Sequence, residues 1–494
     1  MPTHRSRSAR NRSTRRSGNN PLVTLAAISS ASAPPPTVAF DADLVAKYQR
    51  SGPRYTSYPT ADRFTDAFGV ESFQRYLERR DRAPDAGPWS LYVHLPFCAT
   101  VCYYCGCNRI VTANKSRAVS YVDYLVREIA LYGALLGRQR TVRQMHWGGG
   151  TPTFLALDDM ARLLSALRSE FDFLPGAELA IEVDPRTVDV AGVAKLARLG
   201  FNRMSLGVQD FDSDVQVAVN RIQSEAQTLA VMRAARDEGF ASLNVDLIYG
   251  LPRQTPDRFD RTLDKVVGAN PDRIALYSYA HLPELFKAQR QIDEGELPSA
   301  AAKLEILGRA IRCLTEAGYV HIGMDHFARP DDELAVAQRE GRLQRNFQGY
   351  STAAGSDLLA FGMSSIGAVG ASYYQNHRDL AAYCGAIDRN VLPIARGTDL
   401  DIDDLLRRSV IHALMCRFAL DTKAVEDQYA IDFDSYFDAE REQLVALASD
   451  GLIELEGGWI RVTPRGRLLV RNVAMVFDRH LRRGEQRARY SKVI

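Results

Sequence analysis

Four cysteines gathered in one short segment are the least random feature of this chain. The segment LYVHLPFCATVCYYCGCNRI, residues 91–110, contains Cys98, Cys102, Cys105 and Cys107, while the whole chain of 494 residues has only seven cysteines. Thiols so close in sequence converge on one small volume, which predicts either a metal or iron–sulfur site or disulfides. Disulfides are the weaker interpretation, because nothing else in the chain resembles a small cysteine-bridged secreted scaffold.

The C-x3-C-x2-C spacing suits three corners of a cubane iron–sulfur cluster wrapped by a single loop. Structural zinc is the main alternative, but it usually takes two separated pairs of Cys or His ligands, and no second pair follows in the sequence. A four-iron cluster held by three cysteines keeps one iron open to a small molecule, as a catalytic zinc keeps one position open. Cys107 could instead be a fourth ligand that closes the cluster, and the spacing leaves this choice open.

At these residues the chain resembles the radical S-adenosylmethionine enzymes. The longer string YVHLPFC…CYYCGC is similar to the oxygen-independent coproporphyrinogen III oxidases among them. The resemblance implies that Cys98, Cys102 and Cys105 hold a 4Fe-4S cluster and that the open iron binds S-adenosylmethionine. One electron then releases a 5′-deoxyadenosyl radical. Cys107 becomes a residue that does not bind the cluster but is needed near the reaction.

Short strand-like runs alternate with amphipathic helical runs through the middle of the chain. Repeated strand–helix units predict a parallel sheet with right-handed crossovers. Six units are too few for a closed eight-stranded barrel, so the expected fold is α/β, a partial (β/α)6 barrel, which the resemblance also implies. Sites in such folds lie at the C-terminal ends of the strands. The expected strands are 91–95, 142–147, 179–183, 203–208, 243–248 and 274–279, and the expected helices are 121–136, 158–171, 225–238 and 257–267.

Motifs with chemical meaning follow these strands. The second strand leads into GGGTP, residues 148–152, where glycines let the polar groups of a ligand approach the backbone. The third strand carries Glu182 in an E-x-D-P motif. A carboxylate accepts hydrogen bonds from ribose hydroxyls well. An isolated glutamate would more often be a surface ion-pair partner. The resemblance assigns Gly149, Gly150 and Thr151 to the amino group of S-adenosylmethionine. For Glu182 it favours the ribose-binding role over the surface ion pair.

The resemblance also assigns contacts that the residues alone would not reveal. Gln209, Arg221 and Asp246 match positions that contact a second S-adenosylmethionine, and Ala280 lines the same site. Tyr92 is placed near the sulfonium as a cofactor-binding and catalytic residue, beside the catalytic Cys107. Tyr104 lies against adenine through its backbone, and Ile366 packs on the first adenosine.

The two ends of the chain differ from its middle. Residues 1–40 are expected to form a disordered basic tail, for which a targeting signal is the less favoured interpretation. Residues 41–88 form an arm containing GPRYTSYPT, a string similar to one near the N-terminus of the same family. Arg54 in that string could bind a substrate propionate through two hydrogen bonds.

The remaining boundaries divide the chain into a barrel, residues 89–350, a connection to the cap, 351–398, and a C-terminal cap domain, 399–494. The cap is expected to be mostly helical and winged-helix-like, with a hairpin over 452–462 that turns at Gly457 and Gly458. Its mixed charges favour a cap over the barrel mouth rather than a DNA-binding domain.

Composition narrows the class of protein. The formal net charge of +2 argues against nucleic acid as a partner. No apolar run reaches the roughly 20 residues that a membrane-spanning helix needs. The small number of cysteines outside the cluster loop is typical of cytoplasmic proteins. The resemblance implies the oxidative decarboxylation of two propionates of coproporphyrinogen III to vinyls, giving protoporphyrinogen IX in haem biosynthesis. We also expect a monomer and an unidentified electron donor that is flavodoxin- or ferredoxin-like.

Three alternatives remain at this point. The first is a haem-binding chaperone related to the same family, against which Cys107 and the RYTSYPT arm both argue. The second is a zinc-structured protein without redox chemistry. The third is a radical enzyme that acts on another tetrapyrrole.

Overall fold

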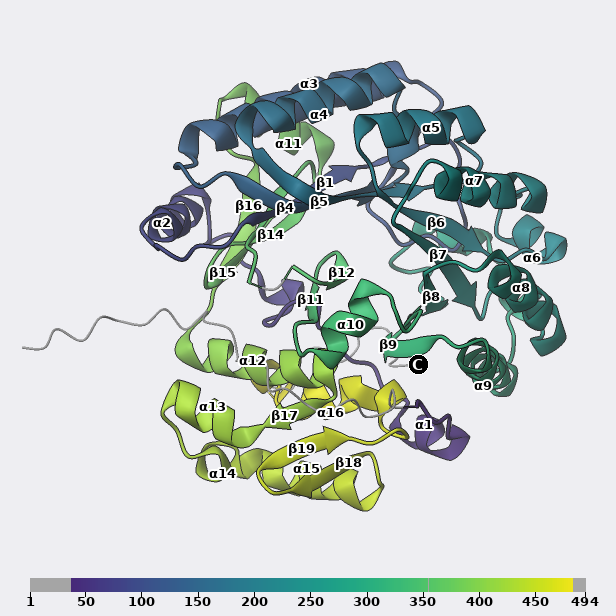
Figure 1. Cartoon of the computed structure of the whole chain (residues 1–494), viewed down its shortest axis with the longest axis vertical. Coiled ribbons are helices and arrows are strands. Elements are labelled where there is room, and N and C mark those ends of the chain that lie inside the picture. The colour runs from purple at the N-terminus through teal and green to yellow at the C-terminus, as the bar shows by residue number, and fades with distance from the viewer. Residues whose placement is uncertain (1–36, 354, 483–494) are drawn as a thin grey trace, which may run out of the picture.

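The protein is organised around one twelve-stranded sheet (Figure 1). The structure is a computed structural model and describes residues 37–353 and 355–482, so the expected basic tail lies almost entirely outside the described residues. The strand order is β16-β15-β14-β13-β1-β4-β5-β6-β7-β8-β10-β9. None of the helices in the described part of the chain is long and apolar enough to cross a membrane.

The six predicted strand–helix units are confirmed as the centre of this sheet. Their strands run parallel to one another in sequence order, and their helices cover the outer face (Figure 1). The strands are β1 (Trp89–Leu95), β4 (Thr141–Gly149), β5 (Asp172–Val183), β6 (Arg203–Gln209), β7 (Ser242–Tyr249) and β8 (Arg273–Ser278). The helices are α3 (Ser116–Leu135), α4 (Leu157–Glu170), α5 (Val190–Leu199), α7 (Glu225–Asp237), α8 (Pro256–Ala269) and α9 (Ala300–Glu316).

Strand β1 shows why this pattern creates a site. Its apolar residues Leu91, Val93 and Leu95 are buried and belong to the main hydrophobic core. Successive side chains of a strand point to opposite faces, so Tyr92 and His94 point away from that core. Alternation along β1 therefore places polar aromatic side chains on the opposite face, where they can reach a ligand.

The segment expected as a plain connection, residues 351–398, contributes instead to the main sheet. Strand β13 (Leu358–Phe361) pairs in parallel with β1, and an antiparallel meander of β14 (Ile366–Ala368), β15 (Ser372–Asn376) and β16 (Ile394–Asp399) continues the sheet. The opposite edge is extended by β10 (His326–Ala328) and β9 (Val320–Gly323). Such short strands pair with partners distant in sequence, so local periodicity does not reveal them.

The C-terminal residues form a separate layer below the barrel (Figure 1). The expected hairpin is present as β18 (Ile453–Glu456) and β19 (Trp459–Val462), joined by β17 (Ala419–Asp421) in a three-stranded sheet. Its helices are α12 (Ile402–Arg417), α13 (Thr422–Tyr429), α14 (Phe433–Tyr436), α15 (Asp438–Ser449), α16 (Val470–Val476) and α17 (Arg479–Arg482).

The N-terminal arm, with α1 (Ala42–Tyr48) and α2 (Val70–Asp81), links these two layers. Asn472 donates to the carbonyl of Tyr48 at 2.9 Å, and Tyr55 donates to Asp478 at 2.9 Å. The arm is therefore held by side chains of the C-terminal layer. The other elements are α6 (Ser213–Ala218), α10 (Glu333–Arg339), α11 (Leu380–Asp388), β2 (Phe97–Cys98), β3 (Ile110–Val111), β11 (Gln344–Asn346) and β12 (Gly349–Ser351).

Candidate active site

The cysteine loop leaves the C-terminal end of β1 and is closed at its base. Strands β2 and β3 pair in parallel, with the amide of Ile110 donating to the Pro96 carbonyl at 2.7 Å and that of Thr112 to the Cys98 carbonyl at 3.0 Å. All four cysteines of the loop are free thiols. The short ladder therefore gathers the thiols at the end of β1, where the fold predicts a site.

Each of the three expected cluster ligands has a donor directed at its sulfur. The Thr151 hydroxyl lies 3.5 Å from Cys98 Sγ, Arg221 Nη1 lies 3.5 Å from Cys102 Sγ, and the Cys107 amide donates to Cys105 Sγ at 3.5 Å. The hydrogen bond with the Cys107 thiol lowers the pKa of Cys105 to about 6 against the effect of burial, and the charge of Arg109 acts in the same direction. Donors directed at sulfur stabilise thiolates and tune iron–sulfur clusters.

The thiol arrangement fits a cluster better than a single ion. In the described ranges no group of three or more His, Cys, Asp or Glu side chains is tight enough to hold one metal ion. The thiolate ligands of a cubane bind separate iron atoms, so they do not need to converge on one point. The residues present therefore fit a 4Fe-4S cluster held by Cys98, Cys102 and Cys105.

Cys107 differs from the other three cysteines. The residue is exposed to solvent, and its hydrogen bond with the Cys105 thiol, supported by the charge of Cys105, raises its pKa well above the usual value. Arg109 holds the backbone here, donating from Nη1 to the carbonyls of Cys105 at 3.1 Å and Cys107 at 3.3 Å. A protonated thiol suits a residue that stays off the cluster, and Arg109 is a positioning residue that sequence reasoning missed.

The glycine loop packs directly beside the cysteine loop. Gly149 has φ +113°, and a Cβ there would lie 2.5 Å from the His94 ring; a Cβ on Gly150 would lie 2.6 Å from the carbonyl carbon of Pro96. Thr151 is tied to the same loop, its amide donating to the Phe97 carbonyl at 2.8 Å. These positions exclude larger residues and expose backbone to the site.

Glu182 lies at the end of β5 and is held by two donors. His146 Nε2 lies 3.0 Å from Oε1, and the amide of Gly149 donates to Oε2 at 3.1 Å. Burial raises the pKa of Glu182, but the bond and charge of His146 and the bond from Gly149 outweigh it, so the pKa is lowered. Glu182 is therefore an ionised acceptor, and His146 is a partner that no sequence signal indicated.

The next strands bring further polar groups to the same end of the barrel. Gln209 ends β6 with φ +67°, and its Oε1 is buried without a hydrogen-bond partner, as is Nε of Arg221, among the residues described. Orphaned buried polar atoms of this kind mark the place of a bound ligand. Arg221 is fixed by Asp184 at 3.0 Å and by the Gly207 carbonyl at 2.6 Å.

The comparisons with known proteins agree with this geometry. A Radical SAM superfamily model matches residues 92–266, and a HemN C-terminal domain model matches 400–469. An oxygen-independent coproporphyrinogen III oxidase of Salmonella typhimurium is 50% identical over 461 residues, covering 92% of this chain and 99% of the relative. One from Helicobacter pylori is 42% identical over 447 residues, covering 90% and 98%.

The chain belongs to the oxygen-independent coproporphyrinogen III oxidase family. Among solved structures it is similar to the coproporphyrinogen III oxidase of Escherichia coli, which is described as a radical SAM enzyme. That similarity has a TM-score of 0.86 with 47% identity and covers 90% of this chain and 100% of that one. The family carries a 4Fe-4S cluster and S-adenosylmethionine, which the thiols and orphaned polar atoms accommodate.

The remaining residues expected from this family lie around the same strand ends. The hydroxyl of Tyr92 lies 3.1 Å from His94 Nδ1, and its ring stacks on His146 with centroids 6.0 Å apart. Asp246 accepts from Asn244 at 2.8 Å; burial and the charge of Glu182 raise its pKa to about 6.

A glutamine that sequence reasoning missed ties the cysteine loop to the end of β8. Gln289 Nε2 donates to the carbonyl of Tyr104 at 3.0 Å and to that of Ala280 at 3.2 Å. Gln289 thereby joins the backbone of Tyr104, expected against adenine, to that of Ala280, expected at the second S-adenosylmethionine site.

Two further predicted residues have contacts within the protein itself. Ile366 begins β14, two strands from β1, and packs with a separate apolar cluster that includes Phe64 and Tyr373. Arg54, suggested as a propionate contact, is paired with Asp325 and lies 5.8 Å from the Tyr277 ring centroid. The role of Ile366 stays a prediction, and Arg54 already has a carboxylate partner within the chain.

Proposed function

We propose that this protein converts two propionate side chains of coproporphyrinogen III to vinyl groups without oxygen, giving protoporphyrinogen IX in haem biosynthesis. The proposal rests on the meeting of the C-x3-C-x2-C loop, the glycine loop and Glu182 at one end of the barrel. It is supported by similarity over nearly the full length to proteins named oxygen-independent coproporphyrinogen III oxidase.

The reaction requires removal of hydrogen from an unactivated carbon, for which no amino acid side chain is reactive enough. When bound, the cluster and S-adenosylmethionine supply a 5′-deoxyadenosyl radical for that purpose. The chain has to bind and orient these groups and to keep solvent from the reaction. Cys98, Cys102 and Cys105 hold the cluster in this account, and Cys107 stays nearby as a protonated thiol.

Glu182 and the glycine loop bind S-adenosylmethionine in this proposal. An ionised carboxylate has about four acceptor sites, and His146 and the Gly149 amide occupy two of them, so the others remain for ribose hydroxyls. Gly149, Gly150 and Thr151 receive the amino group. Tyr92 would lie near the sulfonium, and Ile366 would pack on the adenosine.

Buried polar atoms without a hydrogen-bond partner among the described residues, on the elements that follow Glu182 in the chain, suit a second S-adenosylmethionine. Gln209 and Arg221 offer buried polar atoms without protein partners in the described structure, and Asp246 lies on the neighbouring strand. Ala280 lines that site, whereas the backbone of Tyr104 lies against the adenine beside the cluster loop. We infer further that the protein is a cytoplasmic monomer, with no nucleic-acid or membrane partner, reduced by a flavodoxin- or ferredoxin-like donor.

The test is an anaerobic assay of the reconstituted protein with S-adenosylmethionine, a chemical reductant and coproporphyrinogen III. We expect 5′-deoxyadenosine and the divinyl product to form together. Haem titration of the same preparation addresses the haem-binding alternative. Deoxyadenosine formation that does not depend on the porphyrinogen would show that the substrate is wrong.

A further inference from the structure

Two side chains of β1 that point away from the core are joined by a hydrogen bond. The hydroxyl of Tyr92 lies 3.1 Å from Nδ1 of His94, and Nε2 of His94 lies 3.1 Å from the backbone carbonyl oxygen of Asn108 in the cysteine loop. The His94 residue is buried, with 7% of its surface exposed. The proposed chemistry uses Tyr92 and leaves His94 without a role.

The Asn108 carbonyl determines which nitrogen of His94 carries a proton. A carbonyl oxygen only accepts hydrogen bonds, so Nε2 of His94 is the donor in this contact. Burial lowers the pKa of His94, so the imidazole is neutral near pH 7 and carries a single proton. With that proton on Nε2, Nδ1 is an acceptor, because the hydrogen bond at one ring nitrogen fixes the state of the other.

The state of His94 in turn fixes the direction of the Tyr92 hydroxyl. Burial and the charge of Glu182 raise the pKa of Tyr92 well above its usual value, so the phenol keeps its proton. The hydroxyl donates that proton to Nδ1 of His94, and only the lone pairs of the phenol oxygen remain for other partners. Tyr92 therefore presents an acceptor to the site and not a donor.

Close packing holds the His94 ring in this orientation. A Cβ on Gly149 would lie 2.5 Å from Cε1 and Nδ1 of the ring, so the glycine loop lies directly against it. Tyr121 donates to the His94 carbonyl at 3.0 Å. Asn108 is anchored as well, because its side-chain amide donates to the Arg378 carbonyl at 3.2 Å. A ring enclosed in this way keeps Nε2 at the Asn108 carbonyl.

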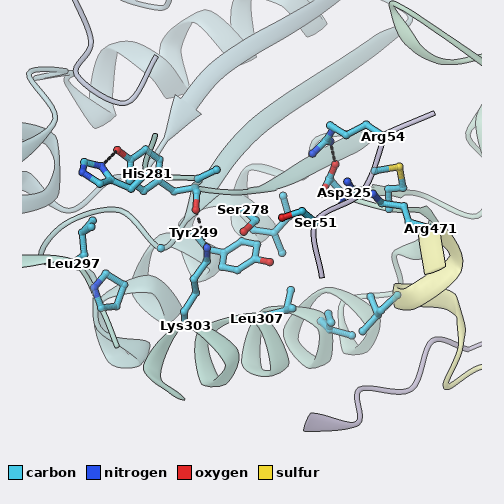
Figure 2. Close-up of a pocket in the computed structure, with 18 of the residues that line it drawn as sticks. Ser51, Arg54, Tyr249, Ser278, His281, Leu297, Lys303, Leu307, Asp325 and Arg471 are labelled. Atoms are coloured by element: carbon cyan, nitrogen blue, oxygen red, sulfur yellow. Dashed lines mark hydrogen bonds and ion pairs between the residues drawn. The ribbon is translucent and has the colours of Figure 1, made fainter. Parts of the chain in front are cut away.

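A second pair of the same kind shows what is particular to the first. The hydroxyl of Tyr279 lies 2.8 Å from Nδ1 of His281, in the wall of a cavity of about 420 Å³ that the arm, the barrel and the C-terminal layer enclose (Figure 2). There Nε2 faces the exposed carboxylate of Glu294 at 3.2 Å, and a carboxylate also stabilises the doubly protonated ring. That pair can take either polarity, whereas burial beside a backbone carbonyl leaves the first pair only one.

We propose that His94 is a positioning residue that makes Tyr92 a hydrogen-bond acceptor toward the sulfonium of S-adenosylmethionine. The inference rests on the proposed function, in which Tyr92 lies near the sulfonium. A phenol oxygen that turns its lone pairs to a ligand attracts a cation, and a phenol that turned its proton there would repel one. The pair therefore favours the charged sulfonium over a neutral thioether of similar shape.

The experiment compares S-adenosylmethionine with S-adenosylhomocysteine, its neutral thioether, as ligands of the full-length reconstituted protein. Each ligand is titrated while the electron paramagnetic resonance signal of the reduced cluster is followed, so that only binding beside the cluster is measured. The quantity compared is the charge preference, defined as the dissociation constant of S-adenosylhomocysteine divided by that of S-adenosylmethionine.

The variants separate the two nitrogens of His94. His94→Leu removes both, His94→Gln keeps a donor for the Asn108 carbonyl, and His94→Asn keeps an acceptor near the position of Nδ1. His377→Leu is the matched control, since it removes a partly buried imidazole from the segment that anchors Asn108. Iron content reports whether each variant has folded around its cluster.

We expect His94→Leu and His94→Gln to lower the charge preference by about tenfold, as is typical of a lost interaction with a charged group. His94→Asn should recover most of it, and His377→Leu should leave it unchanged. Tyr92→Phe should lower it to a similar extent. Adding His94→Leu to Tyr92→Phe should lower it no further, because His94 acts through the Tyr92 hydroxyl.

Two results would overturn the inference while leaving the proposed function intact. One is an unchanged charge preference in His94→Gln or in Tyr92→Phe. The other is an equally large effect of the His94 substitutions in the Tyr92→Phe background, which would mean that His94 acts on the ligand itself. If His94→Leu loses its iron, His94→Gln decides in the same way. A wild-type cluster signal that S-adenosylmethionine does not perturb would refute the proposed function instead.

Discussion

The Arg221 guanidinium lies 3.5 Å from the thiol sulfur of Cys102, although 119 positions separate the two residues in the chain. Asp184 fixes the same nitrogen at 3.0 Å, and both charged side chains are buried. A cation held this close to a cluster ligand stabilises additional negative charge on the cluster. Reduction adds such charge, so Arg221 should make the cluster easier to reduce.

Replacing Arg221 with Met should therefore lower the reduction potential of the cluster. We expect a shift of about 60 mV, which is a tenfold change in the equilibrium constant of a one-electron couple. A redox titration followed by electron paramagnetic resonance measures it. Arg186→Met is the matched control: its nitrogen lies 3.7 Å from the same sulfur and its side chain is more exposed, so its effect should be smaller. An unchanged potential in the Arg221 variant would refute this role.

Serine substitutions should separate the cysteines into two groups. Replacing Cys98, Cys102 or Cys105 with Ser should abolish the brown absorption at about 400 nm and most of the bound iron, because thiolate is the ligand that such clusters require. Cys107→Ser should retain the cluster and lose the divinyl product by about a hundredfold or more, a typical cost of removing a proton-transfer group. Iron analysis and product assay report the two effects, and loss of iron in Cys107→Ser would make Cys107 a ligand.

Glu128 of α3 should make stability depend on pH. It is fully buried and accepts from the Gly362 amide at 2.7 Å, Asn376 at 2.7 Å and Tyr383 at 2.6 Å. Burial raises its pKa to about 7 despite these three bonds. The unfolded carboxyl releases its proton near pH 4.5 and the folded one near 7, so the free energy of unfolding should fall by roughly 3 kcal/mol between these values.

Glu128→Gln lacks this titration, so it should be less stable than the wild type by a margin that shrinks as the pH rises. Midpoints of thermal unfolding at pH 5 and pH 8 measure the margin. Glu78→Gln is the control, because Glu78 is an exposed residue that pairs with Arg82. An equal difference in stability between the wild type and Glu128→Gln at both pH values would contradict the raised pKa of Glu128.

The ion pair of Arg54 and Asp325 should hold the arm on the barrel. Burial raises the pKa of Asp325, but the charges of Arg54, His326 and Arg345 outweigh it and the pKa is lowered. Arg54→Met leaves a mostly buried carboxylate without this partner, which should cost about 3 kcal/mol locally. Limited proteolysis of the arm should show faster cleavage.

The double variant with Arg54→Met and Asp325→Asn should recover most of that protection, because it leaves no buried charge behind. Asp62, paired with Arg63 within the arm, provides a comparison through Asp62→Asn. Unchanged protection in Arg54→Met would mean that the other contacts of the arm, among them those of Arg471, Asn472 and Asp478, are sufficient to hold it.

The cysteine spacing, the glycine loop and the six strand–helix units could be predicted because each is a local pattern. Strand ends and ligand spacings are set over a few residues, and a parallel sheet then brings Glu182, Gln209 and Asp246 to one edge. The strand order from β1 to β8 followed from the same rule.

The residues that tune the site were not predictable in this way. His146 and Gln289 have ordinary local sequence contexts, and each acquires its role from a partner on another element. The four strands within 358–399 were missed for the same reason, since β13 is short and its partner β1 lies far earlier in the chain.

The sequence by itself therefore determined the class of chemistry, because three thiols at fixed spacing and a glycine loop after a strand are local chemical facts. Only the tertiary structure decided which charge faces which sulfur, which carboxylates are buried, and where the arm, the barrel and the C-terminal layer enclose a cavity. Burial and pairing between distant residues depend on the whole packed chain, and no local pattern encodes them.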